Sequence, residues 1–202
     1  MAFPFLGLFI MLIALVSYHR KRGDRRQQEI TDSFWEREQK ANFVRRKDIS
    51  GLPYINIPIE DFSIGALKDE ELNEIEKKLE SFCEKKILNL TGFTNTDLKL
   101  LYGPANLPAL TEYEQNFSDM LFVLNEYIRR LGELEQEQAA IPILEFCIEA
   151  GSDISAHYIQ LAEYYKATKQ LTKIEQLKEK ASALNSLTKT SILQKLDALL
   201  SN

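Results

Sequence analysis

The fold of this chain is decided by two stretches of equal length, LFVLNEYIRRLGELEQEQAAIPILEFCIEAG (residues 121–151) and SAHYIQLAEYYKATKQLTKIEQLKEKASALN (residues 155–185). When the first is offset by thirty-four positions onto the second, small or apolar residues coincide where a helix-turn-helix repeat must bury them. The coinciding pairs are Leu124 with Tyr158, Tyr127 with Leu161, Ile128 with Ala162, Leu131 with Tyr165, Ala140 with Ile174, Ile143 with Leu177 and Cys147 with Ala181. The spacing predicts two consecutive pairs of α-helices.

These residues resemble a pair of tetratricopeptide (TPR-like) repeats over about residues 121–185. Leu161, Ala162 and Tyr165 match positions in the first helix of that family's repeat. The chain departs from the family pattern at three positions, Ile128, Pro142 and Lys178. The resemblance implies a concave groove that holds an extended peptide or a partner helix. The groove-facing positions that it implies are Asn125, Arg129, Ile159, Glu163 and Lys166.

Further helices are predicted around this pair, within an α-helical domain of residues 67–202. Residues 188–200 form an amphipathic helix that would cap the repeat, since each repeat buries its apolar face only against its neighbours. A Thr-x-x-Glu capping box opens a helix over residues 111–131. Apolar residues at helical spacing predict a helix over residues 69–86, and a short helix follows over residues 94–101.

Three segments precede the helical domain. Residues 1–18 carry no charge, and Ala2 to Tyr18 would form about 26 Å of helix, which predicts a transmembrane anchor. Residues 19–47 are polar and basic, and they predict a juxtamembrane helix. Residues 48–66 alternate apolar side chains but contain two prolines, which exclude a central strand and predict an extended arm lying on the helical domain.

Basic residues follow the uncharged stretch directly, as a cluster at the membrane surface. The cluster consists of Arg20, Lys21, Arg22, Arg25 and Arg26. The positive-inside rule therefore predicts a single-pass protein of the cell membrane with its C-terminal domain in the cytoplasm. A cleaved signal peptide is one alternative, although its positive charges would precede the apolar stretch. A buried or interfacial helix is another.

Composition and spacing argue against several classes of function. Residues 48–202 hold fifteen basic and twenty-five acidic side chains, which disfavours nucleic acid as a partner. Cys83 and Cys147 lie far apart in helical contexts and are expected to be buried thiols. Ser152 and His157 lie within six residues of each other, which indicates a helix start rather than a catalytic triad. No catalytic, cofactor-binding or metal site is predicted, so we do not expect an enzyme.

The function predicted from these features is a membrane-tethered protein-interaction scaffold or adaptor that exposes a helical repeat to the cytoplasm. An alternative is a structural subunit of a larger membrane complex, and a remote alternative is a cryptic enzyme. The stretch of residues 87–118 also resembles one found in small bacterial single-pass membrane proteins with no known activity. That resemblance implies membrane association but no particular chemistry.

Overall fold

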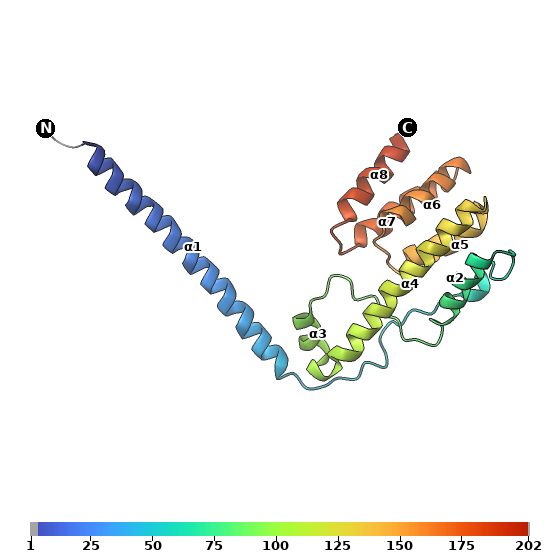
Figure 1. Cartoon of the computed structure of the whole chain (residues 1–202), viewed down its shortest axis with the longest axis horizontal. Helices are drawn as coiled ribbons and strands as arrows, with labels where there is room; N and C mark the ends of the chain where they lie inside the picture. The colour runs from blue at the N-terminus through green and yellow to red at the C-terminus, as the bar shows by residue number, and fades with distance from the viewer. Residues whose placement is uncertain (1–3, 202) are drawn as a thin grey trace. The chain divides into compact units, whose positions relative to one another are not determined.

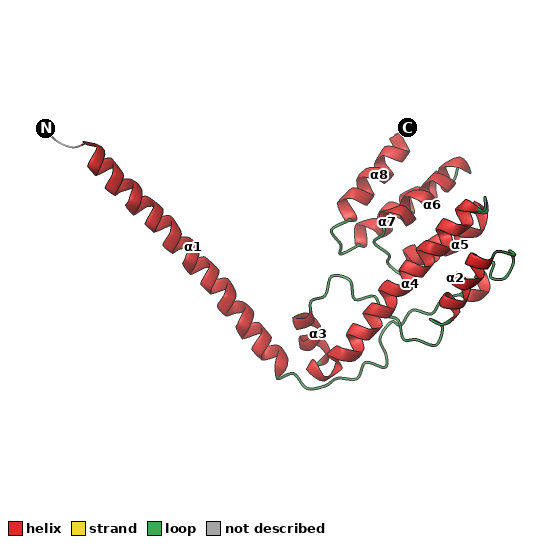
Figure 2. Ribbon diagram, in the orientation of Figure 1, coloured by secondary structure: helices red, strands yellow, loops and turns green. Residues whose placement is uncertain are grey.

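The structure, a computed structural model, describes residues 4–201. Within this range it contains eight α-helices and no β-strand, so the predicted mainly α class is confirmed (Figure 2). The helices are α1 (Pro4–Asn42), α2 (Glu70–Glu80), α3 (Asn95–Tyr102), α4 (Leu107–Glu133), α5 (Glu137–Glu149), α6 (Ser155–Ala167), α7 (Leu171–Ala183) and α8 (Lys189–Ser201). The chain divides into two compact units, which are described separately below.

The first unit is built from α1 and α3. Helix α1 is one continuous helix of 39 residues that runs through most of the predicted anchor and of the predicted juxtamembrane helix. The first three residues of the predicted anchor lie outside the described part of the chain. The C-terminal end of α1 packs against α3, where Arg37 pairs with Asp97 and Lys99 pairs with Glu38. Across the described residues, no helix combines enough length with enough apolar character to pass through a bilayer.

A buried asparagine closes the first unit. Asn106 is 1% exposed, and its side-chain amide donates hydrogen bonds to the carbonyl oxygens of Lys47 and Tyr102, each at 2.7 Å. Gly103 directly follows Tyr102 and has a φ of 86°. A Cβ atom there would lie 2.6 Å from the carbonyl oxygen of Arg45, so only glycine fits at this approach of two backbones.

The second unit contains helices that recur at a fixed spacing, visible as the stack of α5, α6, α7 and α8 in Figure 1. Helix α5 begins at Glu137 and α7 at Leu171, while α6 begins at Ser155 and α8 at Lys189, so the starts within each pair lie thirty-four positions apart. Helix α8 therefore stands where the first helix of a further repeat would begin. It packs against both α6 and α7.

The turns inside the two repeats have the same geometry. Glu135 and Lys169 are the two non-glycine residues with positive φ among the described residues, at 57° and 60°, and they are separated by the same thirty-four positions. In each turn the next residue donates its backbone N–H to a carbonyl of the first helix, Gln136 to Leu131 at 2.8 Å and Gln170 to Tyr165 at 2.7 Å. A left-handed residue followed by such a bond satisfies carbonyls that a helix end leaves free.

The arm of residues 48–66 lies on the second unit. It contains one turn of 3₁₀ helix, η1 (Ile59–Asp61), and no α-helix. Ile55 donates its backbone N–H to the carbonyl of Ile87 at 3.0 Å. Phe62 is 5% exposed and meets Phe146 of α5 edge to face, with ring centroids 5.8 Å apart. Burial of this ring attaches the arm to the α5 side of the repeat.

Several predicted boundaries are wrong. Helix α2 ends at Glu80 rather than near residue 86, and Cys83 beyond it is exposed rather than buried. Helix α4 begins at Leu107 rather than residue 111, because Pro108 fits the first turn, where a missing N–H costs little. Pro142, one of the three departures from the family pattern, lies inside α5, and the helix continues through it. Burial of the apolar face of α5 outweighs the single hydrogen bond lost there.

Candidate functional site

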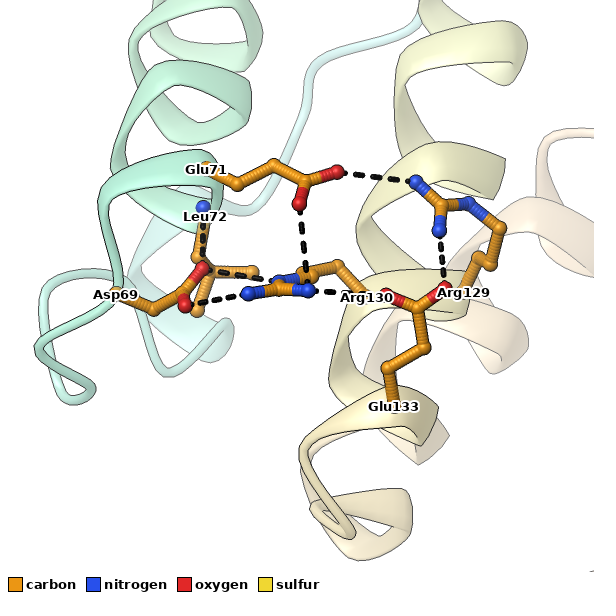
Figure 3. Close-up of polar contacts among 6 residues, drawn as sticks. All are labelled: Asp69, Glu71, Leu72, Arg129, Arg130 and Glu133. Carbon is orange, nitrogen blue, oxygen red and sulfur yellow. Dashed lines mark hydrogen bonds and ion pairs between the residues drawn. The ribbon is translucent and has the colours of Figure 1, made fainter.

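An ion-pair network joins the start of α2 to α4, beside the groove described below (Figure 3). Arg130 of α4 holds Asp69 through two guanidinium nitrogens, Nε at 3.0 Å and Nη2 at 2.6 Å. Asp69 is also the N-cap of α2, because its carboxylate accepts the backbone N–H of Leu72 at 2.8 Å. The hydrogen bonds from Arg130 and Leu72 lower the pKa of Asp69, and the hydrogen bond to Asp69 raises the pKa of Arg130. Both groups therefore stay ionised.

Arg129 belongs to the same network, although it lies on the more exposed side of α4. Its Nη2 atom donates to Glu71 of α2 at 3.1 Å, and its Nη1 atom donates to Glu133 one turn further along α4. These hydrogen bonds raise the pKa of Arg129. Figure 3 shows its guanidinium lying between the two carboxylates, so its charge is compensated within the chain.

A groove of about 700 Å³ lies beside this network, between α4, α5 and α6. Its floor is apolar and includes Ile128, Leu144 and Tyr164. Ile128 and Leu144 are 5% and 3% exposed, so they belong to the core and reach the groove only at its base. Polar side chains form the walls. A concave site with an apolar floor and a few polar groups is typical of ligand and peptide sites.

The structure brings three of the five predicted groove residues together. Asn125, Arg129 and Glu163 all line this groove. Ile159 and Lys166 do not line it. Ile159 packs partly buried against the core, and Lys166 donates its ammonium to the carbonyl oxygen of Leu199 in α8 at 2.7 Å. Spacing alone could not separate these two residues from the others, because the contacts of Lys166 depend on where α8 packs and the burial of Ile159 depends on how the core packs.

Other groove residues were missed by the sequence interpretation. Glu137 and Ile141 line the groove from α5, the second helix of the first repeat. The family resemblance places groove-facing residues on first helices alone. The signal that could have found Glu137 is its place in the first turn of a predicted helix, directly after the turn that follows Arg129 and Glu133.

The arm does not line this groove. Its residues Pro58, Asp61 and Phe62 instead line a second hollow of about 610 Å³, formed mainly by α5, α6 and α7. Phe62 contacts Phe146, which belongs to that second hollow. The groove beside Arg129 is therefore left uncovered by residues 48–66.

The Ser152 and His157 side chains meet, but away from the groove. Ser152 Oγ lies 2.9 Å from His157 Nδ1 and accepts the backbone N–H of Ile154 at 3.2 Å. Both residues are 0% exposed. Asp153 accepts a hydrogen bond from Ser186 instead of completing a triad, and His157 Nε2 has no hydrogen-bond partner among the described residues. Burial lowers the pKa of His157 to about 4. The pair stabilises the start of α6.

The predicted basic cluster lies in the first unit. Its five residues, Arg20, Lys21, Arg22, Arg25 and Arg26, are all exposed on α1. None of them forms a salt bridge within the described part of the chain. Their charges are therefore free to meet an external anionic surface.

Comparisons with known proteins add no family to this picture. No protein-family model matches the chain, and no solved structure is similar to it. Among the described residues, no group of histidine, cysteine, aspartate or glutamate side chains is arranged to hold a metal ion.

Proposed function

We propose that this protein is a membrane-tethered adaptor whose helical repeat holds a segment of a partner protein in the cytoplasm. The observation that carries the proposal is the groove between α4, α5 and α6, which has an apolar floor and polar walls and which the arm leaves uncovered. Helical repeats use concave surfaces of this kind to bind extended peptides or partner helices. The recurrence of helix starts every thirty-four positions supports assigning the repeat to the tetratricopeptide type.

The exposed start of α1 supports the membrane tether. The large apolar side chains from Phe9 to Val16 are between 50% and 71% exposed. They occupy nearly every position over two turns, so the helix is apolar on all sides and not only along one stripe. A helix of this kind is surrounded by apolar material in a core or in lipid. The basic cluster that follows supports the cytoplasmic orientation of the rest of the chain.

Two lysines placed in this apolar segment should release the protein from the membrane. A lysine at the centre of an apolar helix opposes the insertion of that helix into lipid by about 2.5–3.5 kcal/mol. We expect Leu12→Lys with Leu15→Lys to move most of the protein into the soluble fraction of lysed cells. The matched control, Gln27→Lys with Gln28→Lys, adds the same charge beyond the basic cluster and should stay with the membrane. Equal distribution of the two variants would contradict the tether.

Site-specific photo-cross-linking in living cells tests the groove. A photoreactive residue in place of Gln160, which is exposed and lines the groove, should give a discrete adduct of higher mass. The control position is Gln138, which is exposed on α5 but outside the groove. The adduct should be at least several times weaker there, because a bound segment contacts the groove and not the rest of α5. The same adducts from both positions, or none from either, would count against the proposal.

A further inference from the structure

The two cationic residues predicted from the sequence to face the groove, Arg129 and Lys166, both bind other groups within the chain. Arg129 donates one nitrogen to Glu71 and another to Glu133. Lys166 donates to the last turn of α8 and lies outside the groove. An acidic partner would have to displace these internal carboxylates and carbonyl before it could bind either cation. The positive charge at the groove is therefore already compensated.

The charges that remain free at the groove are negative. Glu137 lines it from the first turn of α5, and Glu163 lines it from α6. Both side chains are exposed, and neither forms an ion pair or a side-chain hydrogen bond within the described residues. Glu133 is the third carboxylate of the groove, and it alone is neutralised, by Arg129 and Arg130. Two uncompensated carboxylates thus stand at the mouth of an apolar groove.

We infer that the groove takes a basic amphipathic segment of a partner protein. Its apolar side chains would lie on the apolar floor that includes Ile128 and Leu144, and its Lys or Arg side chains would pair with Glu137 and Glu163. The inference rests on the proposed function and adds the charge of the partner to it. The acidic balance of residues 48–202 attracts the same partner over a longer range, which raises the rate of encounter.

Direct binding to defined peptides tests the inference on the full-length protein in nanodiscs of neutral lipid, with empty nanodiscs as the blank. The probes are a fluorescent helical peptide of leucine and lysine and the same peptide with glutamate in place of lysine. The groove variant is Glu137→Gln with Glu163→Gln. The matched control is Glu112→Gln with Glu179→Gln, two exposed carboxylates outside the groove and without ion pairs in the described chain. Both variants change the net charge equally.

We expect the leucine-lysine peptide to bind the wild-type chain and the control with similar affinity. The groove variant should bind it about tenfold more weakly, since two partly desolvated ion pairs together give roughly this factor. The difference should shrink in 1 M salt, where the Debye length is about 3 Å. Binding of the leucine-glutamate peptide with equal affinity would overturn the inference. An equal loss in both variants would also overturn it, because attraction to the acidic body would then explain the binding.

A third probe separates a partner protein from a second copy of this chain. A peptide of residues 14–26 joins apolar residues to the basic cluster. Weaker binding of this peptide than of the leucine-lysine peptide supports a foreign partner, whereas tighter binding that depends on Glu137 and Glu163 overturns that assignment. If the Gln160 cross-link persists while no charge preference is found, only the inferred charge of the partner is wrong. Loss of the cross-link would instead remove the proposed function itself.

Discussion

Lowering the pH from 6.5 to about 4 is expected to reduce the free energy of unfolding by on the order of 3 kcal/mol through one side chain, His157. The imidazole is 0% exposed, and its only hydrogen-bond partner among the described residues is Ser152 Oγ. Its Nε2 atom has no hydrogen-bond partner in that part of the chain. A charged imidazolium in this place would lose its hydration without gaining a carboxylate, so the folded chain favours the neutral ring.

The sign of the effect follows from proton binding in the two states. Burial lowers the pKa of His157 to about 4 in the folded chain, against an ordinary value of 6.5. Between these two values the unfolded chain binds more protons than the folded chain, so stability falls as the pH falls. The stability due to the neutral ring is fully present above pH 6.5 and is lost by about pH 4. Carboxylates such as Asp69, whose pKa is lowered, contribute only toward the acidic end of this range.

Urea unfolding at a series of pH values measures this effect. His157→Asn keeps a polar atom near Ser152 but does not titrate, so its free energy of unfolding should be nearly independent of pH between 7 and 5. The variant loses some stability to the cavity it leaves, and the test therefore compares slopes and not absolute values. The control is His19→Gln, at an exposed position of α1 and the other histidine of the chain. A wild-type slope in His157→Asn would contradict the prediction.

Tyr127→Phe is expected to lower the free energy of unfolding by about 2–3 kcal/mol. Tyr127 is 0% exposed, and its hydroxyl donates to Glu76 Oε1 at 2.9 Å. Glu76 is 5% exposed, and within the described residues its other oxygen accepts only the backbone N–H of Gly65 at 3.1 Å. Burial and the neighbouring carboxylate raise the pKa of Tyr127, so the hydroxyl keeps its proton. Removal of that hydroxyl leaves one oxygen of a buried carboxylate without a donor.

A matched substitution and a double-mutant cycle isolate this hydrogen bond. Tyr113→Phe removes a hydroxyl that forms no hydrogen bond in the described structure and should change stability by less than about 0.5 kcal/mol. Glu76→Gln should lower the free energy of unfolding less in the Tyr127→Phe background than in the wild-type chain. A neutral amide oxygen without a hydrogen-bond donor is less costly to bury than a carboxylate oxygen without one. The measurement is chemical unfolding followed by circular dichroism. Equal losses of unfolding free energy in Tyr127→Phe and Tyr113→Phe would show that the hydrogen bond to Glu76 does not stabilise the fold.

Helix content and the repeat period of thirty-four positions were predictable because both are local properties. The apolar spacing of residues 121–185 depends only on which face of each helix is buried, and residues three or four positions apart always share a face. Helix ends were predicted less well. Thr111 has the features of an N-cap, yet the turn through Pro104 and the fit of Pro108 in a first turn start α4 four positions earlier.

The charge of the candidate groove could not be predicted in the same way. The sequence pattern predicts Arg129 to be an exposed cation, but it forms an ion pair with Glu71, which lies 58 positions earlier in the chain. Lys166 is likewise occupied by a carbonyl of α8, 33 positions later. Each pairing depends on how two helices pack, and no local spacing records that packing.

The sequence by itself determined that the chain is helical, that its apolar pattern recurs in the C-terminal part, and that its net charge is positive before residue 48 and negative after it. Tertiary structure alone decided which helices the arm covers. It also decided that, among the described residues, Glu137 and Glu163 have no ionic partner while Arg129 and Lys166 are bound within the chain. Periodicity reports the environment of one helix face, whereas a free charge is defined by the absence of distant partners. Tertiary packing alone determines whether those partners lie near the charge or far from it.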